Sequence, residues 1–139
     1  STILNGYFSD SSRMFCIGNV SEEKRKLVQV TKECVEIGLK EVKPWHFLGD
    51  MGQAVHDHAF ANGYTVVREI GGHGIGLEIN EMPVLAPRMK QELEPGMVFA
   101  LEPKIVLPGI GPVGIENSWV VTAEGVEKLT LCKEEIVEL

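Results

Sequence analysis

The stretch GGHGIGLEINEMP, residues 71–83, tells more about this chain than any other segment. It places one imidazole, His73, among glycines, which let the backbone take positive φ angles and let other groups approach closely. A histidine on such a bare backbone is presented in the way that a metal ligand or a substrate-contacting residue requires. A glycine-rich turn with an incidental histidine is the alternative, so the segments around this stretch decide between the two.

Two downstream segments place a carboxylate at the end of an apolar, strand-prone run. Glu102 ends the run MVFALE at residues 97–102, and Glu116 follows the short run VGI. A Pro108-Gly109 turn lies between them, so adjacent antiparallel strands would point both carboxylates at one place. Burying two carboxylates without a partner is costly, and a cation between them removes that cost. Two exposed glutamates on a sheet are the alternative.

An aspartate near the start of the chain completes the candidate ligand set. Asp10 lies in the serine-rich segment GYFSDSSR at residues 6–13, where an aspartate that binds its own backbone is a common alternative to a ligand. The candidate ligands are then Asp10, His73, Glu102 and Glu116. Three carboxylates and one imidazole favour Mn, Co, Fe or Zn over a thiolate-bound structural zinc.

The motifs GYxxDxxR, GHGIGLE, PGMxFxxEP and GIEN occur in this order along the chain. Together they resemble the pita-bread metallopeptidases, a group that includes methionine aminopeptidase, Xaa-Pro aminopeptidase, prolidase and creatinase. The resemblance covers nearly the whole chain and implies an α+β pita-bread fold, in which helices cover a curved antiparallel sheet. It also implies a hydrolase that uses two divalent ions in the complete enzyme. Such an enzyme removes the N-terminal residue of a peptide, of the methionine or the Xaa-Pro type.

The resemblance also implies a role for each candidate residue. The positions that match the metal ligands of the family are Asp10, His73, Glu102 and Glu116. Of these, Glu116 matches the ligand that bridges two ions, and Glu102 matches the ligand that also transfers a proton. Asn80 stands where these enzymes usually place a second histidine, so it is the expected substrate-contacting and catalytic residue. An amide can donate a hydrogen bond there, but it cannot carry the charge of a proton.

The family pattern extends beyond the start of this chain. The resemblance implies a further metal-binding aspartate and a catalytic histidine upstream of Ser1. Residues 1–139 are therefore expected to form a single catalytic-type pita-bread domain, truncated at its N-terminus, that corresponds to the C-terminal portion of the full fold. With one carboxylate fewer, the chain is expected to hold one ion or none and to show little turnover.

Two other functions stay open beside the aminopeptidase. The first is a pita-bread domain without catalysis that serves as a binding module, although retention of all the candidate ligands argues against it. The second is a creatinase-like hydrolase that cleaves C–N bonds outside peptides.

The composition limits which partners the protein can bind and in which cellular compartment it is expected. The formal net charge of −7 argues against nucleic acid or an anionic membrane as partner, because either requires a basic face. No apolar run reaches the length of a membrane span. Three cysteines without disulfide or zinc spacing favour reduced thiols and a cytoplasmic protein. The peptide substrate is what the resemblance implies. A homodimer stays open.

Local patterns predict the secondary structure. Helical periodicity from Leu27 to Ile37, with Ser21 as N-cap and Pro44 as the stop, predicts one helix, and a second is predicted from about Gly49 to Asn62. Strands are predicted at residues 2–8, 13–17, 65–67, 97–101, 104–107, 114–122 and 126–130. Two helices laid over one curved antiparallel sheet are the predicted architecture.

Overall fold

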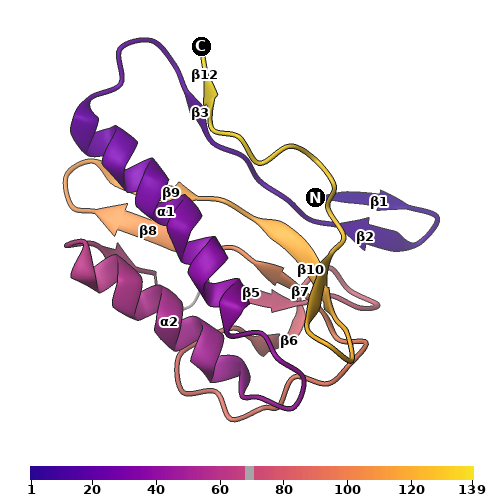
Figure 1. Cartoon of the computed structure of the whole chain (residues 1–139). Coiled ribbons are helices and arrows are strands. Elements are labelled where there is room, and N and C mark those ends of the chain that lie inside the picture. Colours follow the sequence, from indigo (N-terminus) through magenta and orange to yellow (C-terminus); the bar gives the residue numbers. More distant parts are fainter. Residues whose placement is uncertain (68–70) are drawn as a thin grey trace.

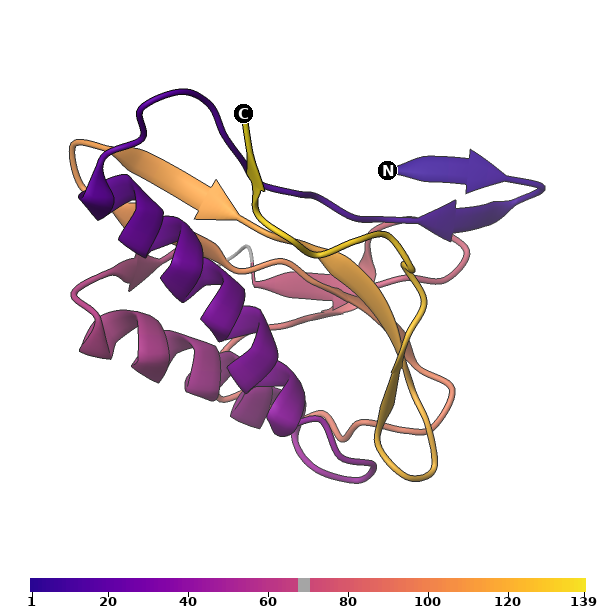
Figure 2. The same cartoon turned by 45° about the horizontal axis from the view of Figure 1, so that its top comes forward.

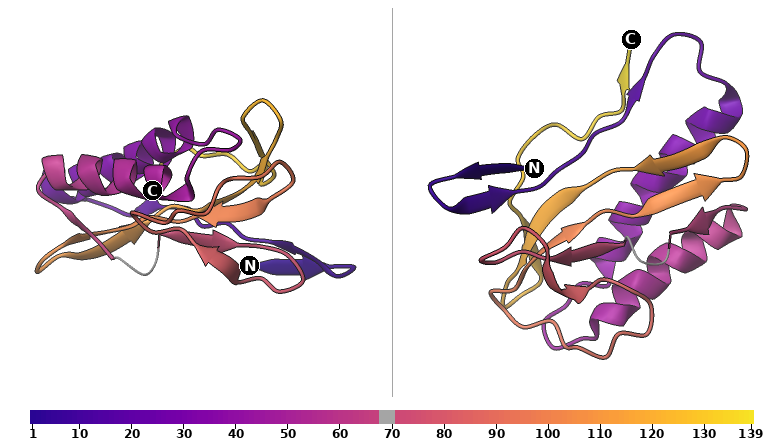
Figure 3. Two further views of the ribbon diagram at one scale, coloured as in Figure 1. Left: turned by 90° about the horizontal axis from the view of Figure 1, so that it is seen from below. Right: turned by 180° about the vertical axis from the view of Figure 1, so that it is seen from behind.

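The computed structural model of this chain describes residues 1–67 and 71–139. In that part of the chain, two helices lie side by side over one face of an antiparallel sheet (Figure 1, Figure 2). Seen from below, the helices form one layer and the strands a second (Figure 3). The α+β arrangement predicted from the sequence is confirmed. Neither helix in the described ranges is both long and apolar enough to cross a bilayer.

Helix α1 spans Glu22–Lys40 and begins where the sequence predicts. The hydroxyl oxygen of Ser21 accepts a hydrogen bond from the backbone N–H of Lys24, which satisfies one free donor of the first turn. Glu22 and Glu23 complement the positive end of the helix dipole. The buried face of the helix carries Leu27, Val28, Val30, Thr31, Cys34, Val35 and Gly38.

Helix α2 spans Leu48–Ala61, within one residue of the prediction at each end. It packs against α1 at Gly38, where an added Cβ would come within 2.9 Å of Cγ2 of Val55. The thiol of Cys34 contacts the carbonyl oxygen of Val55 at 3.7 Å. The absence of a side chain at Gly38 therefore sets how closely the two helices approach.

The main sheet lies beneath the helices and has the order β11-β10-β7-β5-β6 among the described strands. Its strands are β5 (Gly72–Gly74), β6 (Glu81–Val84), β7 (Val98–Leu101), β10 (Asn117–Val121) and β11 (Val126–Lys128). All neighbouring pairs are antiparallel. Strand β7 lies between β5 and β10, so His73 on β5, Glu102 directly after β7 and Glu116 directly before β10 belong to neighbouring segments.

A smaller antiparallel sheet continues from the end of β7. In the described residues it has the order β4-β8-β9, with β4 at Thr65–Val66, β8 at Lys104–Leu107 and β9 at Gly111–Gly114. Only Glu102 and Pro103 separate β7 from β8, so the two sheets meet beside Glu102.

The predicted single strand at residues 2–8 is wrong. The segment forms a hairpin, β1 (Thr2–Leu4) and β2 (Tyr7–Ser9), that projects from the layered body (Figure 1, Figure 3). Asn5 and Gly6 make the turn with φ of 52° and 84°. Asn-Gly favours positive φ at both central residues of a two-residue hairpin loop, and this signal outweighs the apolar run around it.

Two further differences concern the strands near the site. The predicted strand at residues 114–122 is two strands, because β9 ends at Gly114 and β10 begins at Asn117. The tail of the chain adds β12 (Val137–Glu138), which pairs in parallel with β3 (Phe15–Cys16) and was not predicted. Glu116 therefore lies between two strands rather than within one.

Candidate metal centre

Strand β7 fixes which face of the sheet carries the site. Leu101 is buried in the core cluster that includes Met51 of α2, so it points toward the helices. Successive side chains of a strand point to opposite faces. Ala100 and Glu102 therefore point to the face away from the helices.

The neighbouring strands place polar side chains on that same face. His73 of β5 and Ser118 of β10 are both paired with Ala100, and residues directly opposite each other across a ladder share a face. Glu116 precedes Ser118 by two residues, and its carboxyl is near enough to Glu102 for the charge of one to act on the other. The ladder register thus brings side chains from three chain segments together.

His73 lies within a strand and is 8% exposed, rather than standing in an open glycine loop. Gly72 and Gly74, which flank it, are needed because neighbouring backbone lies too close to leave room for a Cβ at either position. A Cβ at Gly72 would lie 2.1 Å from the carbonyl oxygen of Ala100, and one at Gly74 would lie 2.6 Å from that of Met82. The glycines thus let three strand backbones crowd around the imidazole.

The imidazole of His73 is oriented by its own strand. Its Nδ1 lies 3.0 Å from the carbonyl oxygen of Gly74, which makes Nδ1 the protonated nitrogen. Nε2 is then the nitrogen that faces the acids, and it lies 3.8 Å from Oδ2 of Asp10 and 3.5 Å from Oε1 of Glu102. A histidine held in this way presents Nε2 as a metal ligand.

Asp10 is tied to β10 through its backbone. The hydroxyl of Ser118 donates to the carbonyl oxygen of Asp10 at 2.7 Å, and the backbone N–H of Asp10 lies 3.3 Å from the same hydroxyl oxygen. The two residues are 108 positions apart in sequence. This pairing orients the carboxylate of Asp10 so that its Oδ2 faces His73, while Oδ1 lies 3.5 Å from the terminal nitrogen of Ser1.

Glu116 is a buried acid of the cluster whose pKa is raised. Its backbone exchanges hydrogen bonds with Ser12, and its side chain is buried. Burial, and after it the charges of Glu102 and Asp10, raise the pKa of the Glu116 carboxyl to about 7, although the charges of Lys104 and His73 lower it in part. The carboxylates therefore repel one another in a site where little water is present to solvate their charges.

Glu102 follows β7 directly and divides its carboxylate between two partners. Oε2 accepts a hydrogen bond from Nζ of Lys104 at 2.7 Å, and Oε1 faces Nε2 of His73. The backbone N–H of Glu102 donates to the carbonyl oxygen of Gly71 at 3.0 Å. The residue is thereby fixed at the end of β5, beside His73.

The ligand atoms of Asp10, His73 and Glu116 all lie within 4.8 Å of one another. Glu102 stands beside this trio through its contact with His73. Clustered carboxylates, one of which prefers to be protonated near neutral pH, together with an oriented imidazole suit a hard divalent cation. The residues present therefore fit a metal ion.

Arg13 is a residue of the site that sequence reasoning did not single out, although it ends the motif GYxxDxxR. Its guanidinium donates to the carbonyl oxygens of Ser12 at 2.7 Å and of Glu116 at 2.8 Å. It also donates to Oδ1 of Asn117 at 2.7 Å and to the carbonyl oxygen of Lys133 at 2.8 Å. Arg13 therefore clamps the Glu116 segment between the start and the tail of the chain.

Asn80 is exposed and immediately precedes β6. The next residue, Glu81, is paired with Gly74, so Asn80 lies near the end of the strand that carries His73. The carboxylate of Glu81 accepts from the backbone N–H of Glu78 at 2.6 Å and lies against Gly76. Glu81 thus closes the loop that leads to Asn80.

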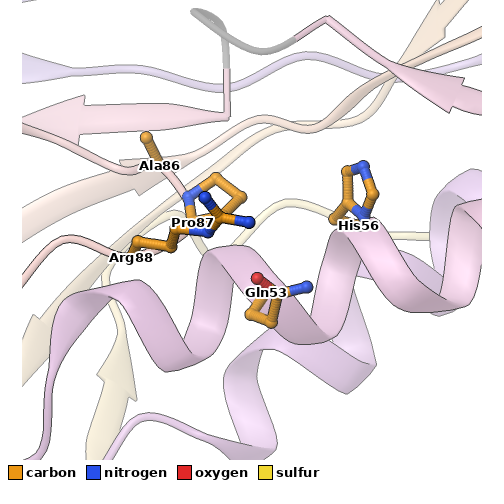
Figure 4. A pocket seen from close by; sticks show the side chains of 5 residues that line it. All are labelled: Gln53, His56, Ala86, Pro87 and Arg88. Carbon is orange, nitrogen blue, oxygen red and sulfur yellow. The ribbon is translucent and has the colours of Figure 1, made fainter.

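A separate hollow of about 350 Å³ lies between α2 and the segment after β6. The close view shows Gln53 and His56 on the helix facing Pro87 and Arg88 on that segment (Figure 4). None of the candidate metal ligands lines it. The hollow is therefore distinct from the charged cluster.

Comparison with known proteins gives one family. The model of metallopeptidase family M24 matches residues 1–123. Methionine aminopeptidase A of Synechocystis sp. is 37% identical over 93% of this chain and 59% of its own length. The chain spans about half the length of the curated relatives it matches.

Solved structures agree with this result. The dipeptidase of Pyrococcus horikoshii is similar with a TM-score of 0.89 and 32% identity, over 96% of this chain and 38% of that one. The Xaa-Pro dipeptidase of Bacillus anthracis gives a TM-score of 0.87 and 36% identity over the same shares.

Proposed function

This chain belongs to metallopeptidase family M24, and on that premise we propose that it carries the metal site of an aminopeptidase. The proposed reaction is hydrolysis of the peptide bond after the N-terminal residue of a peptide. Its α+β structure is a pita-bread fold, as expected. One observation carries the proposal, namely the convergence of Asp10, His73 and Glu116 within 4.8 Å.

The proposed ligands are those predicted from the sequence, Asp10, His73, Glu102 and Glu116. Oxygen ligands with one imidazole suit Mn or Co, and Fe or Zn also accept such a set. A divalent ion held there would supply Lewis acidity that polarises a peptide carbonyl and acidifies water. The role of Glu116 as a shared ligand is supported by its central, buried position among the other acids.

Glu102 is the proposed proton carrier. Its Oε2 is held by Lys104, whereas Oε1 faces the cluster, so Oε1 is the atom that would take a proton from water and return it to the leaving amine. Asn80 is the proposed substrate contact, because an exposed amide at the end of the His73 strand can both donate to a carbonyl and accept from an amide.

The proposed substrates are peptides that begin with methionine or with an Xaa-Pro sequence. Both types are supported by the names of the similar proteins, which include a methionine aminopeptidase and an Xaa-Pro dipeptidase. A cytoplasmic location is proposed on the three free cysteines, Cys16, Cys34 and Cys132.

The test combines metal binding with product analysis. Calorimetric titration of the protein with Mn²⁺ is expected to show saturable binding that His73→Ala abolishes, whereas the exposed control His46→Ala leaves it unchanged. Peptides beginning with Met-Ala and with Ala-Pro, incubated with this protein and with Mn²⁺ or Co²⁺, are expected to lose one residue at a low rate, which mass spectrometry detects. Peptide binding without cleavage would favour the non-catalytic module, and absence of metal binding would contradict the proposed function.

A further inference from the structure

Lys104 stands at the edge of the acidic cluster as a cation in direct contact with a proposed metal ligand. Its Nζ lies 2.7 Å from Oε2 of Glu102, and its charge also lowers the pKa of the Glu116 carboxyl against the opposing effect of the other acids. Both partners are largely withdrawn from solvent, with side chains 30% and 15% exposed. The pair is therefore less screened than a surface ion pair.

The chain makes room for this lysine. Lys104 begins β8 and pairs with Gly114 of β9. A Cβ at Gly114 would lie 2.6 Å from Cδ of Lys104, so the stem of the lysine lies flat on the glycine. With its stem held there, the ammonium is directed along the sheet to Glu102 rather than outward into water.

We propose that Lys104 is a built-in competitor of the metal ion: it neutralises part of the acidic cluster when no ion is bound and lowers the affinity of the site for divalent cations. This inference rests on the proposed function, since it concerns the same four ligands. The ammonium occupies Oε2 and leaves only Oε1 to face His73. Glu102 can then bind an ion through one oxygen while it keeps the lysine, or through both oxygens only by releasing it.

The charge of Lys104 decides the direction of its effect on binding. An ammonium beside a ligand repels a divalent ion. Removal of the ammonium lets the Glu102 carboxylate rotate more freely, but it also makes the site more negative. The conformational entropy of one carboxylate side chain is small compared with the electrostatic energy of a unit charge acting on a doubly charged ion a few ångströms away. Removal of the charge is therefore expected to tighten binding, whereas a purely supporting role would weaken it.

The experiment compares Lys104→Met, which keeps the stem length and removes the charge, with Lys104→Arg and with a control. Lys26 of α1 lies over the ring of Tyr64, away from the cluster, so Lys26→Met changes the net charge equally without touching the site. Titration with Mn²⁺ alone is expected to give roughly tenfold tighter binding for Lys104→Met. Lys104→Arg and Lys26→Met should stay within about threefold of the wild type.

A second measurement does not involve metal. In chelator, Lys104→Met is expected to lower Tm by roughly 3 °C or more, and the decrease should shrink when Glu102→Gln is also present. If the wild type bound no Mn²⁺ but this coupling appeared, the proposed function would fail and the neutralising role of Lys104 would stand. Unchanged or weaker Mn²⁺ binding by Lys104→Met, beside normal binding by the wild type, would overturn the inference alone.

Discussion

The guanidinium of Arg13 donates a hydrogen bond of 2.8 Å to the backbone carbonyl of Glu116, a residue 103 positions later in the chain. The same group binds the carbonyl of Ser12, which itself pairs with Glu116 in an isolated bridge. Arg13 thus joins the segment that follows Asp10 to the segment that holds Glu116. Together with the backbone bridge between Ser12 and Glu116, this side chain fixes the relative position of two proposed ligands.

Arg13→Lys is expected to weaken Mn²⁺ binding by roughly tenfold or more, because partners that orient ligands typically contribute that much to metal affinity. An ammonium cannot reach the four acceptors that the planar guanidinium binds at once. Loss of these bonds should also lower the free energy of unfolding by about 2 kcal/mol. Titration calorimetry and urea unfolding are the measurements. Arg25→Lys is the matched control, since Arg25 binds the carbonyl of Val20 and the carboxylate of Glu138 away from the site.

Glu116→Ala is expected to weaken Mn²⁺ binding by at least about 100-fold, whereas Asn80→Ala should change it less than threefold. Glu116 is buried and lies within 4.8 Å of two other ligands, and Asn80 is exposed beside the strand of His73. Asn80→Ala should instead weaken the binding of peptide. Equal losses of Mn²⁺ affinity in the two variants would contradict the assignment.

The stability of the ion-free protein is expected to fall as the pH rises from about 5 to 8. The pKa of the Glu116 carboxyl is raised from 4.5 to about 7 in the folded state, so between these two pH values the folded protein holds a proton that the unfolded chain has released. Stability must then decrease with pH across that window, by up to about 3 kcal/mol. Urea unfolding in chelator at pH 5.5 and pH 8 measures the effect. Glu116→Gln should abolish this contribution. The prediction is refuted if the wild type is more stable at pH 8 than at pH 5.5 and Glu116→Gln leaves this pH dependence unchanged.

Gly72→Ala is expected to destabilise the fold by about 3 kcal/mol or more. The new Cβ would lie 2.1 Å from the carbonyl oxygen of Ala100, and φ at this position is 149°, which L residues rarely adopt. Neither β5 nor β7 can move apart to make room for this Cβ without displacing His73. Gly125→Ala is the control, because an added Cβ there meets nothing within 4 Å. Thermal unfolding of both variants in chelator is the measurement.

Local signals were sufficient where the pattern repeats over several turns. The periodicity from Leu27 to Ile37 and the cap at Ser21 predicted α1, because a helix is specified by neighbours in sequence. The strands were predicted less well. Asn5-Gly6 was overlooked as a hairpin turn, and β5 was hidden because glycine-rich segments carry no strand pattern.

The types of ligand can be predicted from sequence, since an imidazole among glycines and acids at the ends of apolar runs are local features. Which of these residues lie together depends on how the strands pair. The register of β7 with β5 and β10 places His73 and Ser118 opposite the same residue, and Ser118 then brings in Asp10 from 108 positions away. The contact of Lys104 with Glu102 was likewise invisible in sequence, because it depends on a lysine stem lying on Gly114 of the neighbouring strand. Strand pairing joins distant segments by backbone hydrogen bonds, which carry no local mark in the residues that they bring together.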